Sequence, residues 1–267
     1  MAKLPEYEVY AVKYGHHERR ARENFLGGDA HDGPMPLDYF VWLIRGDGRE
    51  IVVDTGFSAA MAAKRGRNLL RCPTEGLRLL GVDPDSVQDV VITHLHYDHA
   101  GNLDLFPDAT LHIQDREVNY ATGRYMCHDC FRGAYEVEDV VSMVRRVYAG
   151  RVCFHEGDAE LAPGVSVHLI GGHTMGIQSV RVMTQRGWLV LASDASHFYA
   201  NMEQVRPFPI VWSVADMVDG YDRLRALAAS SEHIIPGHDP LVLARYPAPS
   251  KALEGIVVRL DGMPKSA

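Results

Sequence analysis

Residues 93–99 combine three imidazoles and one carboxylate in a short run, Thr-His-Leu-His-Tyr-Asp-His. Imidazole nitrogens and carboxylate oxygens together bind Zn²⁺, Fe²⁺, Mn²⁺ or Co²⁺, whereas the absence of a thiolate from the run argues against a closed, cysteine-type structural zinc site. His94 and His96 lie two residues apart and can point to one side of a loop, whereas the adjacent Asp98 and His99 must diverge. The run therefore predicts ligands for two separate metal ions in an open, reactive site.

Three later stretches each offer one further ligand at the end of a predicted strand: Gly171-Gly172-His173, Ser193-Asp194 and Pro236-Gly237-His238. The glycines suit tight turns or a close approach of the backbone to a metal. We therefore expect two divalent metal ions, with zinc as the leading choice and Fe, Mn or Co as alternatives. The expected ligands are His94, His96, Asp98, His99, His173, Asp194 and His238.

The elements that must position these side chains are predicted from residue patterns. A Gly46-Asp47-Gly48 turn indicates a hairpin, and an Arg186-Gly187 turn indicates another. Thr74 is expected to cap a short helix, and Ser213 with Asp216 resembles a capping box at the start of a longer one. Strands are predicted at 6–13, 38–46, 50–53, 89–93, 165–170, 177–183, 187–193 and 233–235.

Composition limits the kinds of partner and compartment. The chain has 267 residues, 46% of them hydrophobic, and no repeat or linker divides it, so we expect one domain spanning 1–267. A net charge of −8 without a dense Lys/Arg cluster argues against nucleic acid and membrane surfaces as partners.

No leader or long apolar run is visible, which predicts a cytoplasmic protein. The four cysteines are expected to be reduced, and Cys127-His128-Asp129-Cys130 lacks a second cysteine pair to complete a zinc knuckle.

The order HxHxDH, GGHT, SDA and GHD, which spans nearly the whole chain, resembles the metallo-β-lactamase superfamily. The resemblance implies an α/β fold, specifically an αββα four-layer sandwich. It also implies that one metal is held by His94, His96 and His173, and the other by Asp98, His99 and His238. Asp194 would bridge both metals, and Asp54, in Val53-Asp54-Thr55-Gly56, would brace the metal loop without ligating.

Within the superfamily, the motifs are most similar to those of the N-acyl homoserine lactonase group. A β-lactamase is disfavoured, because penicillin-degrading members typically lack the bridging aspartate that Asp194 would supply. A diiron flavoprotein is disfavoured, because those proteins carry glutamate at the position of His96. The short stretch after His238 disfavours a glyoxalase II-type thioesterase with its C-terminal helical domain. The resemblance implies that a metal-bridging hydroxide opens a small lactone, with Asp98 as a catalytic residue that carries a proton to the leaving group.

One position departs from the lactonase pattern. Those enzymes carry a tyrosine three residues after the bridging aspartate, whereas this chain has His197 there and Tyr199 two residues later. An imidazole can donate a similar hydrogen bond, and one that titrates near neutrality can act as a general acid, so His197 is the second candidate catalytic residue. Either His197 or Tyr199 can take the tyrosine's place.

Two segments, 14–37 and 120–148, are expected to cover the site and to form an apolar pocket, with Trp212, Phe198 and Phe208 as candidate wall residues. The other histidines are assigned no role, because an isolated histidine is usually a surface or satisfied core residue. They are His16, His17, His31, His112, His128, His155, His168 and His233.

The leading hypothesis is a lactonase acting on an N-acyl homoserine lactone or a similar cyclic ester. The alternative is a hydrolase of the same fold that acts on a heterocyclic catabolic lactone or a thioester. Two hypotheses from other functional classes are a non-catalytic metal sensor and an oxygenase with a single iron. The expected partner is a small lactone or ester, and a homodimer is left open.

Overall fold

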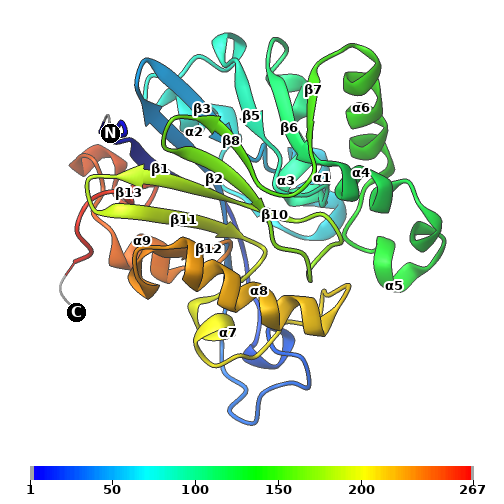
Figure 1. Ribbon diagram of the computed structural model, residues 1–267. Coiled ribbons are helices and arrows are strands. Elements are labelled where there is room, and N and C mark those ends of the chain that lie inside the picture. Colours follow the sequence, from blue (N-terminus) through cyan, green and yellow to red (C-terminus); the bar gives the residue numbers. More distant parts are fainter. Residues whose placement is uncertain (1–2, 266–267) are drawn as a thin grey trace.

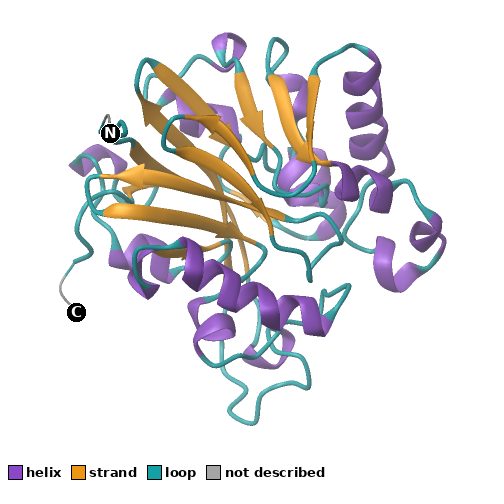
Figure 2. Cartoon of the chain, viewed as in Figure 1, coloured by secondary structure: helices purple, strands orange, loops and turns teal. Residues whose placement is uncertain are grey.

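The computed structural model describes residues 3–265, in which two β-sheets pack face to face with helices on the outside (Figures 1 and 2). The first sheet has the strand order β13-β1-β2-β3-β5-β6-β7, with β4 paired to β1. The second has the order β12-β11-β10-β9-β8. The predicted αββα four-layer sandwich is therefore confirmed.

The strands are β1 Glu8–His17, β2 Leu37–Gly46, β3 Arg49–Val53, β4 Asn68–Leu69, β5 Asp89–Val91, β6 Thr110–Gln114, β7 Val152–His155, β8 Ala159–Ala162, β9 Val165–Leu169, β10 Gln178–Thr184, β11 Gly187–Ser193, β12 Ile234–Pro236 and β13 Val257–Arg259. The α-helices are α1 Ala59–Arg65, α2 Pro73–Arg78, α3 Tyr97–Ala100, α4 Asp115–Ala121, α5 Asp129–Arg132, α6 Val137–Tyr148, α7 Tyr199–Glu203, α8 Val214–Leu227 and α9 Leu241–Arg245.

Strand β2 shows why the fold has four layers. Its first eight residues are all buried, because alternate side chains enter two different cores. Phe40, Trp42 and Ile44 belong to the core between the sheets. Tyr39 and Leu43 belong to the core beneath the outer helices. A strand that is apolar on both faces therefore needs a covering layer on each side.

Helix α8 covers the second sheet with one apolar stripe. Met217, Tyr221 and Leu224 recur at helical spacing and are buried. They belong to the same hydrophobic cluster as Phe40 and Trp42. Half of the predicted capping box is present, since the Ser213 hydroxyl accepts a hydrogen bond from the Asp216 amide at 3.2 Å, whereas the Ser213 amide donates to the Gly172 carbonyl at 2.9 Å. Within residues 3–265, no helix is long and apolar enough to cross a membrane.

Several predicted boundaries were wrong by one to four residues. Helix α2 begins at Pro73 with Cys72 as its N-cap, not at Thr74, because proline is preorganised for the first helical position. Strand β1 runs to His17, past the predicted end at residue 13. Thr184 pairs with Gly187, so the turn consists of residues 185–186.

Parallel pairing brings the ends of several strands together. Strands β3, β5 and β6 are parallel neighbours in the first sheet, and β11 and β12 are parallel neighbours in the second. The carboxyl ends of parallel strands meet at one edge, so Asp54 lies beside the loop that follows β5. In the same way, Asp194 lies beside the loop that carries His238. The two edges face each other, and the candidate ligands extend from them.

Candidate metal centre

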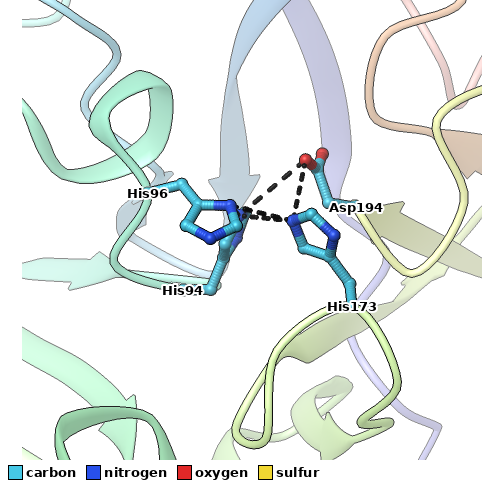
Figure 3. A group of neighbouring side chains, drawn as sticks. All are labelled: His94, His96, His173 and Asp194. Atoms are coloured by element: carbon cyan, nitrogen blue, oxygen red, sulfur yellow. Dashed lines mark hydrogen bonds and ion pairs between the residues drawn. The ribbon is translucent and has the colours of Figure 1, made fainter. Parts of the chain in front are cut away.

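Three imidazoles converge at the end of β5 (Figure 3). His94 Nε2 lies 3.0 Å from His96 Nδ1, and His173 Nε2 lies 2.9 Å from His96 Nδ1 and 3.2 Å from His94 Nε2. Asp194 Oδ2 lies 3.4 Å from His173 Nε2 and 3.8 Å from His94 Nε2. All four side chains are buried and form one group of ligand atoms.

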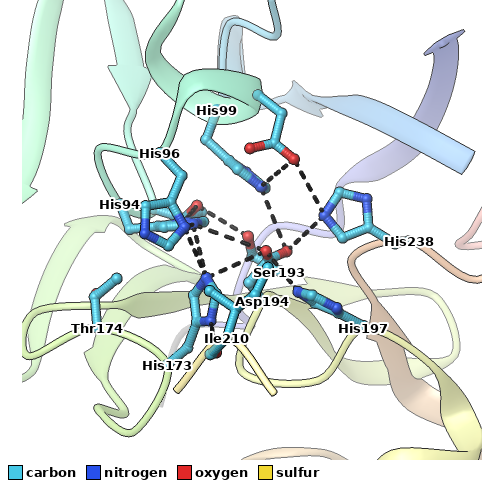
Figure 4. A network of polar contacts seen from close by, with 12 residues as sticks. His94, His96, His99, His173, Thr174, Ser193, Asp194, His197, Ile210 and His238 are labelled. Carbon is cyan, nitrogen blue, oxygen red and sulfur yellow. Dashed lines mark hydrogen bonds and ion pairs between the residues drawn. The ribbon is translucent and has the colours of Figure 1, made fainter. Parts of the chain in front are cut away.

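A second group gathers around the other oxygen of the same carboxylate (Figure 4). Asp194 Oδ1 lies 2.9 Å from His238 Nε2 and 3.4 Å from His99 Nε2. Asp98 Oδ2 lies 3.7 Å from His238 Nε2 and 3.8 Å from His99 Nε2. The structure thus brings all seven predicted ligands together, with Asp194 between the two groups.

Hydrogen bonds on the outer side of the rings fix which nitrogen faces inward. His99 Nδ1 donates to Asp54 Oδ2 at 2.7 Å, His173 Nδ1 donates to the Ile210 carbonyl at 2.7 Å, and His238 Nδ1 donates to the Asp38 carbonyl at 2.9 Å. Because these oxygens only accept, each Nδ1 carries the proton and each Nε2 turns a lone pair inward. Metal-binding histidines are oriented in the same way.

The inward-facing atoms fit a divalent cation. Imidazole nitrogens bound at about 2.0–2.1 Å to a tetrahedral ion are about 3.3 Å apart, close to the spacings among the first three rings. Buried Asp194 Oδ1 and His99 Nε2 have no hydrogen-bond partner within residues 3–265. Lone pairs that face one another repel unless a cation lies between them, so the donor set suits two metal ions.

The protonation states of the candidate ligands also bear on metal binding. Burial, together with neighbouring imidazoles, lowers the pKa of His94 and of His96 well below the ordinary value, so both rings are neutral. Burial also lowers the pKa of His99, but the carboxylates around it outweigh this effect and raise the pKa well above its ordinary value, so a metal ion bound at His99 would replace the proton on Nε2. Burial raises the pKa of Asp194, but His238 and His99 hold it well below the usual range. Asp194 is therefore an anion.

Asp54 braces the metal loop, as predicted. Its Oδ1 accepts the Thr93 amide at 2.8 Å, and its Oδ2 accepts the Thr93 hydroxyl at 2.9 Å in addition to His99. The Thr93 hydroxyl also lies 2.9 Å from Ser193 Oγ on the second sheet. Asp54 and Ser193 have φ of 61° and 48°, a left-handed conformation that is uncommon for non-glycine residues. Strain of this kind persists where the surrounding contacts overdetermine it, typically at functional sites.

A buried glutamate that the sequence analysis missed joins two of the loops. Glu117 accepts hydrogen bonds from the Leu95 amide at 2.9 Å, the Tyr135 hydroxyl at 2.8 Å, the Thr174 hydroxyl at 2.6 Å and the Gly176 amide at 3.2 Å. Burial raises its pKa, and these hydrogen bonds oppose the rise. Leu95 separates two candidate ligands and Thr174 follows a third. Glu117 thereby holds the loop after β5 against the loop after β9.

A cavity of about 280 Å³ opens beside the two groups. Its lining is partly apolar, as expected, but it also includes Arg19, Arg65 and Arg67. Arg65 is paired with Glu136 at 2.5 Å, whereas Arg67 donates to the Tyr97 hydroxyl at 3.0 Å. No carboxylate within residues 3–265 forms an ion pair with Arg19 or Arg67. The cavity therefore has cationic groups available to a ligand.

The two segments expected to cover the site do so only in part. Residues 17, 19 and 37 of the first segment and residues 130, 131, 133 and 134 of the second line the cavity. Residues 137–148 of the second segment form helix α6. Trp212 packs against Tyr125 at a ring-centroid distance of 4.4 Å, and neither it nor Phe198 lines the cavity.

His197 lines the cavity, and its ring stacks on Phe208 with centroids 3.5 Å apart and an interplanar angle of 12°. Its Nε2 lies 2.9 Å from Asp194 Oδ2. Burial lowers the pKa of His197 to about 3, which favours a neutral ring over the expected general acid that titrates near neutrality. The neutral ring is a fixed hydrogen-bond donor to Asp194. Tyr199 instead belongs to the hydrophobic core, beneath the Arg245 guanidinium.

The sandwich fold and the paired ligand groups define a class of metal-binding α/β proteins. The sequence model of the metallo-beta-lactamase superfamily matches residues 35–240, and the chain belongs to this superfamily.

Among curated relatives, the chain is 31% identical over 173 residues to N-acyl homoserine lactonase AttM of Azorhizobium caulinodans. It is 34% identical over 177 residues to N-acyl homoserine lactonase AiiB of Agrobacterium fabrum. The matches cover 61% and 62% of this chain, and they span 62% and 61% of the length of those relatives.

Solved structures show the same fold. A quorum-quenching N-acyl homoserine lactone lactonase superposes with a TM-score of 0.74 at 23% identity, covering 90% of this chain and 95% of that chain. AidC, described as a dizinc quorum-quenching lactonase in complex with a product, superposes with a TM-score of 0.70 at 15% identity, covering 90% of each chain.

Proposed function

We propose that this protein is a dinuclear metal-dependent hydrolase that opens a small lactone, such as an N-acyl homoserine lactone or a similar cyclic ester. The observation that carries the proposal is the position of Asp194, which turns one oxygen to each of two groups of ligand atoms. The lactonase names of the relatives support the substrate class.

In this proposal His94, His96 and His173 hold one ion, Asp98, His99 and His238 hold the other, and Asp194 bridges them. Zinc is the expected metal because the donors are imidazole nitrogens and carboxylate oxygens, with Fe, Mn and Co as alternatives. The description of AidC as a dizinc lactonase supports this choice.

Two such ions would make a water between them nucleophilic near neutral pH and would polarise the ester carbonyl. The chain's own residues supply positioning and proton transfer. Asp98 lines the cavity, and its backbone carbonyl accepts the buried Tyr14 hydroxyl at 2.7 Å, which fixes its place. Its carboxylate takes a proton from the attacking water and delivers it to the leaving ring oxygen.

His197 acts as a positioning residue that holds Asp194 through its Nε2–H. Replacing His197 by Ala should lower kcat about 10- to 100-fold, the loss expected for a hydrogen bond to a charged group. His197→Gln, whose amide can still donate, should retain more activity and more metal than His197→Ala. If the alanine variant keeps the full rate and metal content, the positioning role is refuted.

The central test is Asp194→Asn. Loss of the bridging charge should weaken metal binding and abolish turnover together, measured by metal analysis of the purified protein and by lactone hydrolysis. Asp219→Asn is a matched control, because Asp219 lies exposed on α8. Two metal equivalents and full activity in Asp194→Asn would contradict the bridging role.

The substrate class is tested with acyl homoserine lactones of varied chain length, simple γ-lactones, a glutathione thioester and a β-lactam. Hydrolysis confined to the thioester and the β-lactam would end the lactonase proposal. Bound metal without any turnover would favour a sensor, and oxygen consumption with a single iron would favour an oxygenase.

The arginines of the cavity favour a second candidate among the alternatives, a heterocyclic lactone that carries a carboxylate. Arg19 and Arg67 can bind such an anion, whereas a neutral acyl chain leaves both without a counter-charge. Matched lactones with and without a ring carboxylate separate the two candidates. A higher kcat/KM for the carboxylate lactone supports the second candidate, and a lower value supports the acyl homoserine lactone.

A further inference from the structure

Strands β6 and β7 carry a separate group of ligand-type side chains. His112, Cys153 and His155 are half-buried, and each offers a ligand atom within 4.8 Å of the other two. These strands contribute none of the seven candidate ligands described above. From the sequence alone, the two histidines have no expected role and the cysteine is expected to be a reduced thiol.

The register of the two strands explains why the three side chains meet. His112 lies directly opposite Cys153 in the parallel β6–β7 pair, and His155 lies two residues beyond Cys153. Alternate residues of a strand share a face, so all three lie on the same side of the sheet. Leu111 and Ile113 point to the opposite side and are buried in the core beneath the outer helices. Strand β7 is the last strand of its sheet.

The hydrogen bonds orient the rings as in a metal site. His112 Nε2 lies 3.0 Å from Asp89 Oδ1 and donates its proton to that carboxylate. In the neutral ring this leaves a lone pair on Nδ1, which faces His155 Nε2 at 3.2 Å. The two rings are nearly parallel, with an interplanar angle of 7°. A carboxylate that accepts from the far nitrogen is a common partner of metal-binding histidines.

We propose that His112 Nδ1, Cys153 Sγ and His155 Nε2 bind a third metal ion, a thiophilic cation such as Zn²⁺. The nitrogens already lie 3.2 Å apart, close to the ~3.3 Å expected around a tetrahedral zinc, and a fourth position is left for water. Thiolate with imidazole suits zinc and copper. Binding releases the thiol proton of Cys153, and the ion ties edge strand β7 to β6.

The experiment uses Co²⁺ as the probe, titrated into the full-length protein after metal removal. Cobalt bound to a thiolate absorbs by charge transfer in the near ultraviolet, and the candidate metal centre contains no cysteine. The signal therefore reports this third site whether or not the proposed hydrolase function holds. We expect the amplitude of the signal to correspond to one thiolate-bound Co²⁺ per chain, whatever amount of Co²⁺ binds at the candidate metal centre.

The signal should disappear in Cys153→Ser, and His112→Ala should weaken Co²⁺ binding at least about 10-fold. Cys127→Ser is the matched control and should keep the signal, because Cys127 is an exposed thiol outside the group. Circular dichroism checks that Cys153→Ser is folded, and His155→Ala replaces it if it is not. Absence of the signal in the wild-type protein, its persistence in Cys153→Ser, or its loss in Cys127→Ser would each overturn the proposal.

Discussion

Gly237 occupies a place beside the metal centre that has no room for a side chain. A Cβ there would lie 2.6 Å from Asp194 Oδ1 and 2.8 Å from the carbonyl carbon of Ser193. Ordinary van der Waals contact begins at 3.4 Å, so the carboxylate must retreat by about 0.8 Å, the difference between 3.4 and 2.6 Å. Gly237 does not have a positive φ, and the cost of Gly237→Ala is therefore steric alone.

Gly237→Ala is expected to weaken metal binding. Metal–ligand distances tolerate shifts of only about 0.2 Å, so a displaced Asp194 can no longer bridge both ions well. Overpacking of this kind costs about 1–3 kcal/mol, which corresponds to roughly 5- to 150-fold weaker metal affinity. The melting temperature of the metal-free protein should fall too, because the Ser193 backbone, 2.8 Å from the added Cβ, cannot move aside as a side chain can.

Metal affinity is measured by competition with a chromophoric chelator, and melting is followed with and without Zn²⁺. Gly33→Ala is the matched control, since its Cβ would meet nothing closer than 3.8 Å. If Gly237→Ala binds metal as tightly as the wild-type protein, the close approach of Gly237 to Asp194 does not govern the site, and the reasoning fails.

Two further predictions concern stability. Glu117→Ala leaves two backbone amides and two hydroxyls without their acceptor, so the free energy of unfolding should fall by about 3 kcal/mol or more. Urea unfolding measures this free energy, with Glu160→Ala as the exposed control. Equal stability of the two variants would contradict the prediction. Burial and the charge of Glu136 raise the pKa of Asp139 to about 7 from an ordinary value of 3.8. The stability that this group contributes is therefore fully present below pH 3.8 and is lost as the pH rises to about 7. Asp139→Asn carries a neutral side chain at every pH. After allowance for solvent screening, this variant should be more stable than the wild-type protein by about 1 kcal/mol at pH 8 and by less at pH 5. Melting curves that show the same gain at both pH values would contradict this prediction.

The sequence predicted which side chains converge at the candidate metal centre, because their signals are local. Four ligands lie within one short run, and the other three each follow a recognisable strand end. The four-layer fold came from the resemblance, and the doubly buried strand β2 gives its physical reason. Helix and strand ends were less accurate, since Pro73 rather than Thr74 decides where α2 begins.

Features that depend on the folded arrangement could not be predicted. Glu117 receives donors that lie 22 and 57 residues away in the chain, and no local motif marks it. The arginines of the cavity come from the segment after β1 and from the end of α1, so their meeting is a property of the packed sandwich. The pKa of His197 depends on burial against Phe208, and residue spacing carries no information on burial of that kind.

The two sheets each supply part of the ligand set. In the proposed assignment, each ion takes two side chains from the loop after β5 and two from the second sheet, counting Asp194 for both. Neither half of the chain, divided between β7 and β8, would hold a complete coordination sphere. Joining the halves and capturing the ions would then be one cooperative event, already begun by the hydroxyl contact between Thr93 and Ser193.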